Sequence, residues 1–259
     1  PQCRSAGGWT TRQRMHSAVG TRALQYQSGG PNYQPMCGRY GFGNPARLSE
    51  LPFGVTLPPS VPRFNIGPMQ SVPLVFQDGS DRRAEMAKWG LVPYWADDPS
   101  IGSRMCNARG DTVAEKPAFR SAFRSRRALM PAEFFFEWQV IEGSKTKQPW
   151  CIALEDGEPF AFAALWERWR AKSNPDADAM ITCAVITTEP NATMAPIHNR
   201  MPVILRAGNF EQWLDPATTP ADARSLVRPY DGAMRAWKVS TRVNKIGNEG
   251  GENIRPIED

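Results

Sequence analysis

The stretch Pro159-Phe-Ala-Phe-Ala-Ala-Leu-Trp166 contains the longest notable apolar run of the chain, and the expected fold follows from it. It is much shorter than the roughly 20 residues that span a bilayer, which excludes a transmembrane helix. Its length and its Phe and Trp content are typical of a buried strand. Further runs bounded by Gly, Pro or Asp predict strands in the same way: Ser71–Phe76, Arg83–Trp89, Trp150–Leu154, Pro159–Leu165, Met180–Thr187, Pro202–Leu205 and Met234–Val239.

Helical periodicity is clearest over Ala114–Arg127, where Phe119 and Phe123 lie one turn apart and Arg120, Arg124 and Arg127 line another face. The sequence also predicts shorter helices at Asn44–Leu51, Met194–Ile197, Phe210–Leu214 and Ala221–Val227. It shows no repeat and no regular alternation of strand and helix. We therefore expect an α+β single domain, with a mostly antiparallel sheet or barrel-like core and short helices around it.

The first 35 residues differ in composition from the rest of the chain. They are rich in Gly, Ser, Gln and Arg without a period, so we expect a disordered or non-native extension at 1–35, with a transit peptide as the alternative. The folded domain is expected at 36–259, with Met36 as a sensible start. The net charge of +5 comes largely from arginines in the extension, so bulk charge is no sign of nucleic-acid binding.

Cysteine and histidine usage argues against a bound metal. The five cysteines form no CxxC pair, and His198 is the single histidine after the extension, so we expect no metal and no cofactor. The odd cysteine count fits a reducing compartment such as the bacterial cytoplasm. Cys106, Cys151 and Cys183 sit beside apolar residues and are expected to be inert buried thiols.

Two side chains are candidates for proton transfer. His198, in Pro-Ile-His-Asn-Arg-Met-Pro, is either an acid/base or a histidine hydrogen-bonded to the backbone. Glu137 ends the aromatic run Phe134-Phe-Phe136, where large apolar neighbours would favour its neutral form and make it a proton shuttle. The alternative for Glu137 is a solvated residue on an edge strand.

Other residues suit contact with a nucleic acid. Asn107 offers a donor and an acceptor, and Arg109 offers a fork that matches phosphate, although both also suit a solvated turn. Trp89, Tyr94 and Trp95 lie around a Gly and Pro loop, where aromatic rings either stack on unpaired bases or cap the core.

Cys37 directly follows Met36, so removal of that Met would leave Cys37 at the N-terminus. An N-terminal Cys has a free α-amine beside its thiol. The amine can condense with an aldehyde to an imine, and the thiol can then close a five-membered thiazolidine ring. An internal Cys cannot do this, because its nitrogen is an amide.

Six separated motifs occur in this order: Met36-Cys-Gly-Arg-Tyr40, Arg63-Phe-Asn-Ile-Gly-Pro68, Trp89-Gly-Leu-Val-Pro93, Asn107-Ala-Arg109, Phe136-Glu-Trp138 and Ile197-His-Asn-Arg-Met-Pro202. Together they resemble the SOS response-associated peptidase (SRAP) family of abasic-site shield proteins. The resemblance covers residues 36–259.

The resemblance implies binding of single-stranded DNA that carries an abasic site, with a thiazolidine crosslink between Cys37 and the sugar aldehyde. It implies that Asn107 positions the Cys and the sugar, that Glu137 accepts the α-amine proton, and that His198 acts in ring opening and crosslink reversal. The same resemblance implies self-processing and an AP lyase capability. It also implies that a further set of residues contacts the DNA: Arg39, Asn65, Trp89, Tyr94, Trp95, Arg109, Trp138 and Arg200.

Two other functions stay open. Cys37, Glu137 and His198 could instead form a Cys-dependent peptidase, including one that cuts only its own Met36–Cys37 bond. The chain could also be a non-covalent reader of modified or single-stranded DNA, whose binding would persist without Cys37 and depend on salt. In each case a monomer would suffice.

Overall fold

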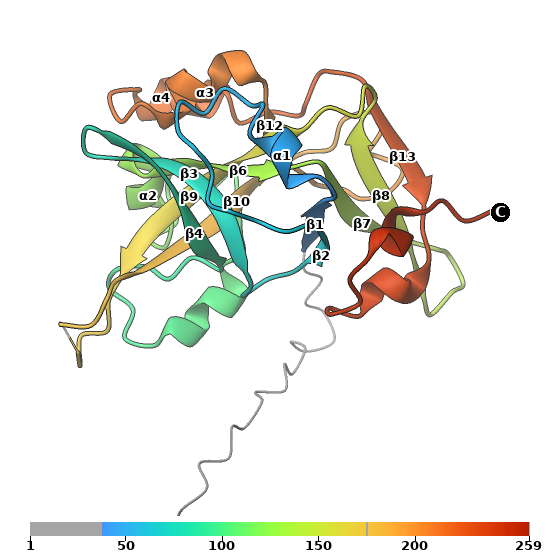
Figure 1. Cartoon of the computed structure of the whole chain (residues 1–259), viewed down its shortest axis with the longest axis horizontal. Coiled ribbons are helices and arrows are strands. Elements are labelled where there is room, and N and C mark those ends of the chain that lie inside the picture. Colours follow the sequence, from blue (N-terminus) through green and yellow to red (C-terminus); the bar gives the residue numbers. More distant parts are fainter. Residues whose placement is uncertain (1–37, 175, 259) are drawn as a thin grey trace, which may run out of the picture. The chain divides into compact units, whose positions relative to one another are not determined.

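The structure is a computed structural model that describes residues 38–174 and 176–258 (Figure 1). Its larger sheet closes into a five-stranded barrel, because β10 pairs with both ends of the run β4-β3-β6-β9. All pairings around the ring are antiparallel except β4 with β10. The barrel strands are β3 (Ser71–Asp78), β4 (Asp81–Trp89), β6 (Arg127–Ala132), β9 (Phe160–Trp169) and β10 (Met180–Thr188). Short strands flank the ring: β5 (Asn107–Arg109), β11 (Met201–Pro202) and β12 (Ile204–Leu205).

The surroundings of strand β9 explain why its sequence is continuously apolar. On one face, Phe162 and Trp166 belong to the main core cluster, together with Phe76 of β3. On the other face, Ala163 and Leu165 pack in a second cluster, against helices outside the barrel. Because both faces are buried, β9 has no need of the polar alternation of a half-exposed strand.

A second, five-stranded sheet has the order β13-β8-β7-β1-β2. One face joins the main core through Phe135 and Ile152, while the opposite face packs Phe136 and Cys151 against Val243. The strand order places β7 at the centre of the sheet, with β1 and β8 as its neighbours. The strands are β1 (Arg39–Phe42), β2 (Arg63–Ile66), β7 (Phe134–Val140), β8 (Lys147–Leu154) and β13 (Met234–Lys238).

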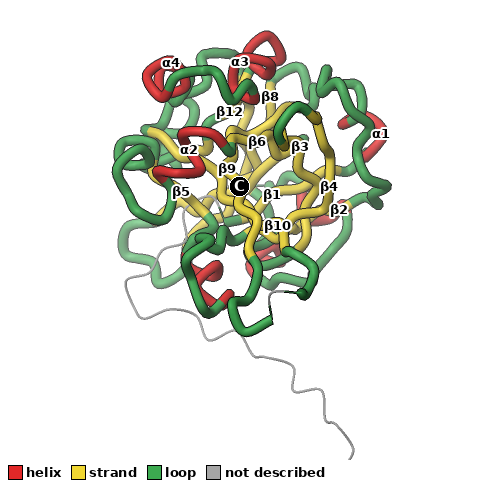
Figure 2. The backbone as a smooth tube through the Cα atoms, turned by 90° about the vertical axis from the view of Figure 1, so that its left-hand side faces the viewer, coloured by secondary structure: helices red, strands yellow, loops and turns green. Residues whose placement is uncertain are grey.

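Short helices surround the sheets, and α3 and α4 lie side by side in both views (Figures 1 and 2). Phe123, Phe210 and Trp213 bury the outer face of the barrel in the second cluster. The helices are α1 (Pro45–Leu48), α2 (Arg120–Ser125), α3 (Phe210–Leu214) and α4 (Pro220–Ser225), with 3-10 turns η1 (Pro99–Arg104), η2 (Ala207–Asn209), η3 (Thr241–Asn244) and η4 (Gly251–Ile254). Within the described residues no helix combines the length and apolar character needed to cross a membrane.

The predicted α+β class with a barrel-like core is confirmed, and each predicted strand has a counterpart. The helix predicted over Ala114–Arg127 is too long, because α2 begins only at Arg120. Pro117 disfavours the helical conformation at Lys116, and residues 111–119 form turns. Arg127 was also misplaced, since it begins β6 and is 2% exposed.

Candidate functional site

Glu137 lies in the middle of the second sheet and not at its edge. Its strand β7 pairs with β1 on one side, where Arg39 faces Phe136, and with β8 on the other, where Glu137 faces Trp150. The side chain is 1% exposed. The structure therefore excludes a solvated edge-strand glutamate and leaves a buried carboxylate among large aromatic residues.

Neighbouring residues on the same face of β7 show which segments pack against the face that carries Glu137. Side chains two positions apart point the same way along a strand, so Phe135, Glu137 and Gln139 share one side of β7. Gln139 donates from Nε2 to the carbonyl of Pro196 at 2.9 Å, and Phe135 lines a small cavity together with Pro202. Glu137 lies between these two contacts and faces the segment that carries His198.

The His198 segment is a set of turns held by its own backbone. The His198 N–H donates to the carbonyl of Met194 at 2.9 Å, and the ring Nδ1 accepts the N–H of Arg200 at 3.1 Å. The same nitrogen lies 3.3 Å from the carbonyl of Arg200, so its role as donor or acceptor depends on the tautomer of the ring. The residue is half-buried, so part of it is open to solvent. Residues 194–197 form turns here and not the predicted helix.

The carboxyl end of β10 gathers further predicted residues. On one side β5 runs parallel to it, with Asn107 beside Val185 and Arg109 beside Thr187, and on the other side β11 pairs at Thr187 and Thr188. Arg200 donates from Nη2 to the carbonyl of Thr187 at 2.7 Å. Asn107, Arg109 and Arg200 are therefore fixed around one strand end.

Two of these arginines share a carboxylate. Arg109 contacts Asp111 at 3.1 Å, and Arg200 lies 3.7 Å from the same residue. Partial burial raises the pKa of Asp111, but the hydrogen bond from Arg109 and the charges of both arginines lower it further, so the net shift is downward. The ionised Asp111 holds two cations close together at the rim of the site.

Arg39 is held by the C-terminal segment. Its guanidinium donates to Oδ1 of Asn65 at 2.9 Å and to the carbonyls of Val243 and Asn244. It also lies 5.7 Å from the ring centroid of Trp138, whose indole N–H donates to Asn244 Oδ1. The cation and the ring therefore form one rigid unit beside Glu137.

One small cavity lies next to these segments. It is lined by residues of β1, β4, β7, β9, β10 and β11, namely Arg39, Tyr40, Trp89, Phe135, Phe162, Val185 and Pro202. Asn107 pairs with the lining residue Val185, Glu137 follows the lining residue Phe135 by two positions, and His198 precedes the lining residue Pro202 by four. Cys37, the predicted nucleophile, lies outside the described residues.

The sequence profile described as "SOS response associated peptidase (SRAP)" matches residues 36–246. The chain belongs to the SRAP family. It is 43% identical over 195 residues to the abasic site processing protein YoqW of Bacillus subtilis (strain 168), covering 74% of this chain and 85% of the relative. The abasic site processing protein HMCES of Gallus gallus is 30% identical over 229 residues, covering 76% and 67%. A crystal structure from Bacteroides thetaiotaomicron matches with a TM-score of 0.66 at 28% identity, over 73% of this chain and 82% of that one.

Two residues of the predicted DNA-binding set have structural roles in this SRAP domain. Trp89 is 1% exposed and donates its indole N–H to the carbonyl of Cys106, so its ring cannot stack on a base. Asn65 is 0% exposed and donates from Nδ2 to the carbonyls of Val243, Lys245 and Asn248. Both side chains are buried and bonded to backbone carbonyls, and DNA contact stays a prediction for each.

Sequence reasoning missed the residues that connect the segments of the site to one another. Gln139 ties β7 to the His198 segment, and its position two residues after Glu137 was the available signal. Val243 and Asn244, which hold Arg39, are far from it in sequence, and no local pattern could have identified them.

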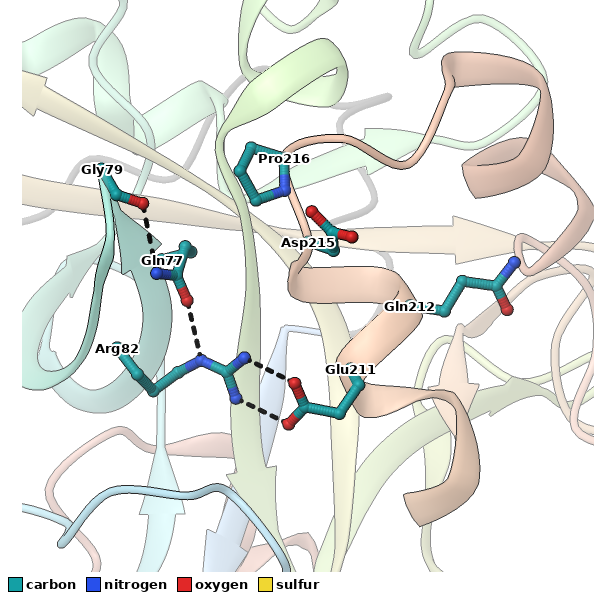
Figure 3. A pocket seen from close by; sticks show the side chains of 7 residues that line it. All are labelled: Gln77, Gly79, Arg82, Glu211, Gln212, Asp215 and Pro216. Carbon is teal, nitrogen blue, oxygen red and sulfur yellow. Dashed lines mark hydrogen bonds and ion pairs between the residues drawn. The ribbon is translucent and has the colours of Figure 1, made fainter.

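A larger hollow lies elsewhere and shares no residue with the site (Figure 3). Arg82 donates to both carboxylate oxygens of Glu211 at 2.9 Å and to Gln77. This pairing ties the β3–β4 hairpin to α3, and the carboxylate neutralises the charge of Arg82. Among the described residues no group of three His, Cys, Asp or Glu side chains is placed to hold a metal.

Asn65→Ala is expected to lower the free energy of unfolding by about 2–4 kcal/mol, because several backbone and Arg39 hydrogen bonds are lost and buried groups stay unpaired. Denaturant unfolding measures this change. Asn209→Ala is the matched control, since the Asn209 side chain makes no capping bond at the start of α3. A change below about 0.5 kcal/mol at Asn65 would contradict its structural role.

Proposed function

We propose that this SRAP protein captures abasic sites in single-stranded DNA by forming a thiazolidine crosslink through Cys37. The observation that supports the proposal is that the segments carrying Asn107, Glu137 and His198 each contribute a neighbouring residue to the cavity that Arg39 of β1 lines. Cys37 is the second residue before Arg39, so chain connectivity alone keeps its Cα within about 7.6 Å of the Arg39 Cα. The names of the relatives, abasic site processing proteins, support the same substrate.

The chemistry needs a free α-amine on Cys37. That amine attacks C1′ of the open-chain sugar, and loss of one water leaves an imine. The thiolate then adds to the imine carbon while the nitrogen takes up a proton, which closes the thiazolidine ring. The net change is loss of one water, with no oxidant or reductant. An imine intermediate is also the species from which β-elimination would proceed, and this accounts for a lyase side activity.

Each polar residue has a role that its position supports. Glu137, buried and next to the strand that follows Cys37, would accept the α-amine proton. His198, with Nδ1 occupied by the Arg200 N–H, would offer Nε2 for opening the sugar ring and for reversing the crosslink. Asn107 would hold the sugar and the Cys in register.

Charge and aromatic surface would hold the strand. Arg39, Arg109 and Arg200 supply cations around the beginning of β1 and the end of β10, and these would neutralise phosphates next to the lesion. Trp138, Tyr94 and Trp95 would contact bases or sugars. Unpaired DNA lets the sugar enter the site without the cost of opening a duplex.

The direct test uses a single-stranded oligonucleotide with one abasic site. It is incubated with the chain beginning at Cys37 and, separately, with all 259 residues, and the products are resolved on a denaturing gel. A heat-stable shifted band only with free Cys37 supports the proposal. A band from the full chain, with mass spectrometry showing Pro1 still attached, would assign the reaction to another amine and overturn it.

A self-cleaving peptidase is the second candidate, and the name of the family, SOS response associated peptidase, favours it. In that function the Cys37 thiol with His198 would cut the Met36–Cys37 bond, which would also expose the α-amine. Mass spectrometry of the purified full chain over time measures this. The two activities are compatible, because cleavage would prepare the crosslinking form.

Glu137→Gln is expected to slow crosslink formation by about 100-fold or more, because the amide keeps the shape of the side chain but cannot accept a proton. Single-turnover gels at several times measure the rate. Glu142→Gln, at an exposed position after β7, is the matched control and should leave the rate unchanged. Equal rates for both variants would remove Glu137 from the mechanism.

A further inference from the structure

Residues 91–97, the aromatic loop, expose two large rings between residues that are buried. Tyr94 is 62% and Trp95 42% exposed, while Val92 is 0% and Ala96 5% exposed. The loop leaves the barrel after β4 and precedes η1. Its two outward rings are therefore flanked on each side by a residue packed into the protein.

The first attachment of the loop is to β10. The N–H of Val92 donates to Oγ1 of Thr182 at 3.0 Å, and that hydroxyl donates in turn to the carbonyl of Glu167 at 3.3 Å. Thr182 is 0% exposed, so both bonds are shielded from water. The hydroxyl bridges the loop and two barrel strands.

The second attachment is the indole of Trp169, at the end of β9. Its Nε1 donates to the carbonyl of Ala96 at 2.8 Å. Val92, Ala96 and Trp169 form a buried cluster of their own, against which Ile101 and Met180 pack. On the outer side Lys172 donates to the carbonyl of Trp95 and pairs with Asp97 at 2.8 Å.

A buried carboxylate faces the same turn. Glu167 is 6% exposed and contacts Arg126 at 2.8 Å. Burial raises its pKa, while the charge of Arg126 and the backbone N–H groups of Arg168 and Tyr94 oppose that rise. The loop therefore meets fixed partners at Val92, Tyr94, Trp95 and Ala96.

We propose that Trp169 and Thr182 are positioning residues for DNA binding, which hold the aromatic loop so that Tyr94 and Trp95 meet unpaired bases in a preformed arrangement. The inference rests on the proposed function and adds to it. A loop that is already ordered loses little conformational freedom on binding, so the stacking free energy appears as affinity. Neither Trp169 nor Thr182 needs to touch the DNA.

The test is a double-mutant cycle on non-covalent binding by the full chain. The probe is an oligothymidylate without an abasic site, and the dissociation constant is measured by fluorescence anisotropy at one salt concentration. Tyr94→Ala/Trp95→Ala is expected to weaken binding about tenfold or more, because the variant loses the stacking of both rings on unpaired bases. Trp169→Phe, which removes the indole N–H, should weaken binding about 3- to 10-fold.

The deciding result is the effect of Trp169→Phe in the Tyr94→Ala/Trp95→Ala background. If Trp169 acts through the two rings, the third substitution changes the dissociation constant less than about twofold there. An equal loss in both backgrounds, or no loss in the wild-type background, would overturn the inference. Thr182→Val gives an independent repeat through the other attachment.

Trp213→Phe is the matched control. Trp213 lies in α3, and its buried indole donates to the carbonyl of Ala128 at 2.9 Å, so the substitution removes the same kind of bond. It should lower the thermal stability at least as much as Trp169→Phe and leave DNA affinity unchanged. If the wild-type chain beginning at Cys37 crosslinks abasic DNA while Trp169→Phe binds as tightly as wild type, this inference alone fails. If the chain beginning at Cys37 does not crosslink and the wild-type full chain does not bind, the proposed function fails with it.

Discussion

Cys37→Ala is expected to abolish the heat-stable crosslink to abasic single-stranded DNA, a loss of more than about 1,000-fold in product. The α-amine of this variant can still form an imine, but no thiol is present to close the ring, and the imine hydrolyses on heating. The measurement is the denaturing gel described above, with the chain beginning at residue 37. Non-covalent binding to undamaged DNA should change little.

Cys37→Ser separates the amine from the thiol. Its amine can form the imine, so borohydride should trap a crosslink that is absent without the reductant. Cys106→Ala is the matched thiol control, because burial raises the Cys106 pKa to about 12 and keeps that thiol protonated. Retention of the heat-stable band in Cys37→Ala, or its loss in Cys106→Ala, would contradict the assignment of Cys37.

The sequence was most informative where local pattern and tertiary environment agree. The apolar runs of β9 and β10 are buried on both faces, and α3 spans Phe210–Leu214 as predicted. The strands absent from the predicted list are β1, β2, β5, β6 and β7, although the run that ends at Glu137 was treated as a strand. Three of these have only three or four residues, and β1 owes its place to pairing with β7, about a hundred residues later. Such non-local pairing leaves little local trace.

The residues of the candidate site also differ in how well the sequence predicted their roles. Asn107, Glu137 and His198 could be selected because their residue types suit chemistry, and the fold brings their segments together. Asn65 and Trp89 were placed at the DNA because they lie in matched motifs, yet both are buried and hydrogen-bonded to backbone carbonyls. A motif can mark a residue that shapes the site as easily as one that contacts the substrate.

Arg127 shows the strongest conflict between helical periodicity and the fold. Counting three and four residues along 114–127 placed it on one helical face with Arg120 and Arg124. In the structure its guanidinium lies between the ends of α2 and α3. It donates to five backbone carbonyls, those of Phe123, Arg124, Trp213, Asp215 and Thr218. These are carbonyls that two helix ends and a turn would otherwise leave unsatisfied.

Arg127→Met is expected to lower the free energy of unfolding by about 3–5 kcal/mol. Methionine fills much of the same space, but five carbonyls lose their donor, and several of them are shielded from water. Arg127→Lys should recover only part of the loss, because an ammonium group has three donors and no planar fork. Denaturant unfolding gives the free energies, and a fall in the unfolding midpoint at unchanged slope would show that the native state itself is weakened.

Arg124→Met is the matched control, three residues earlier on α2 with an exposed side chain. It should change the free energy of unfolding by less than about 0.5 kcal/mol. Similar values for the two variants would mean that the cation at position 127 contributes no more than surface charge. A large loss confined to Arg127 would instead establish that one buried guanidinium, and not the short helices themselves, joins α2 and α3 to the barrel beside β6.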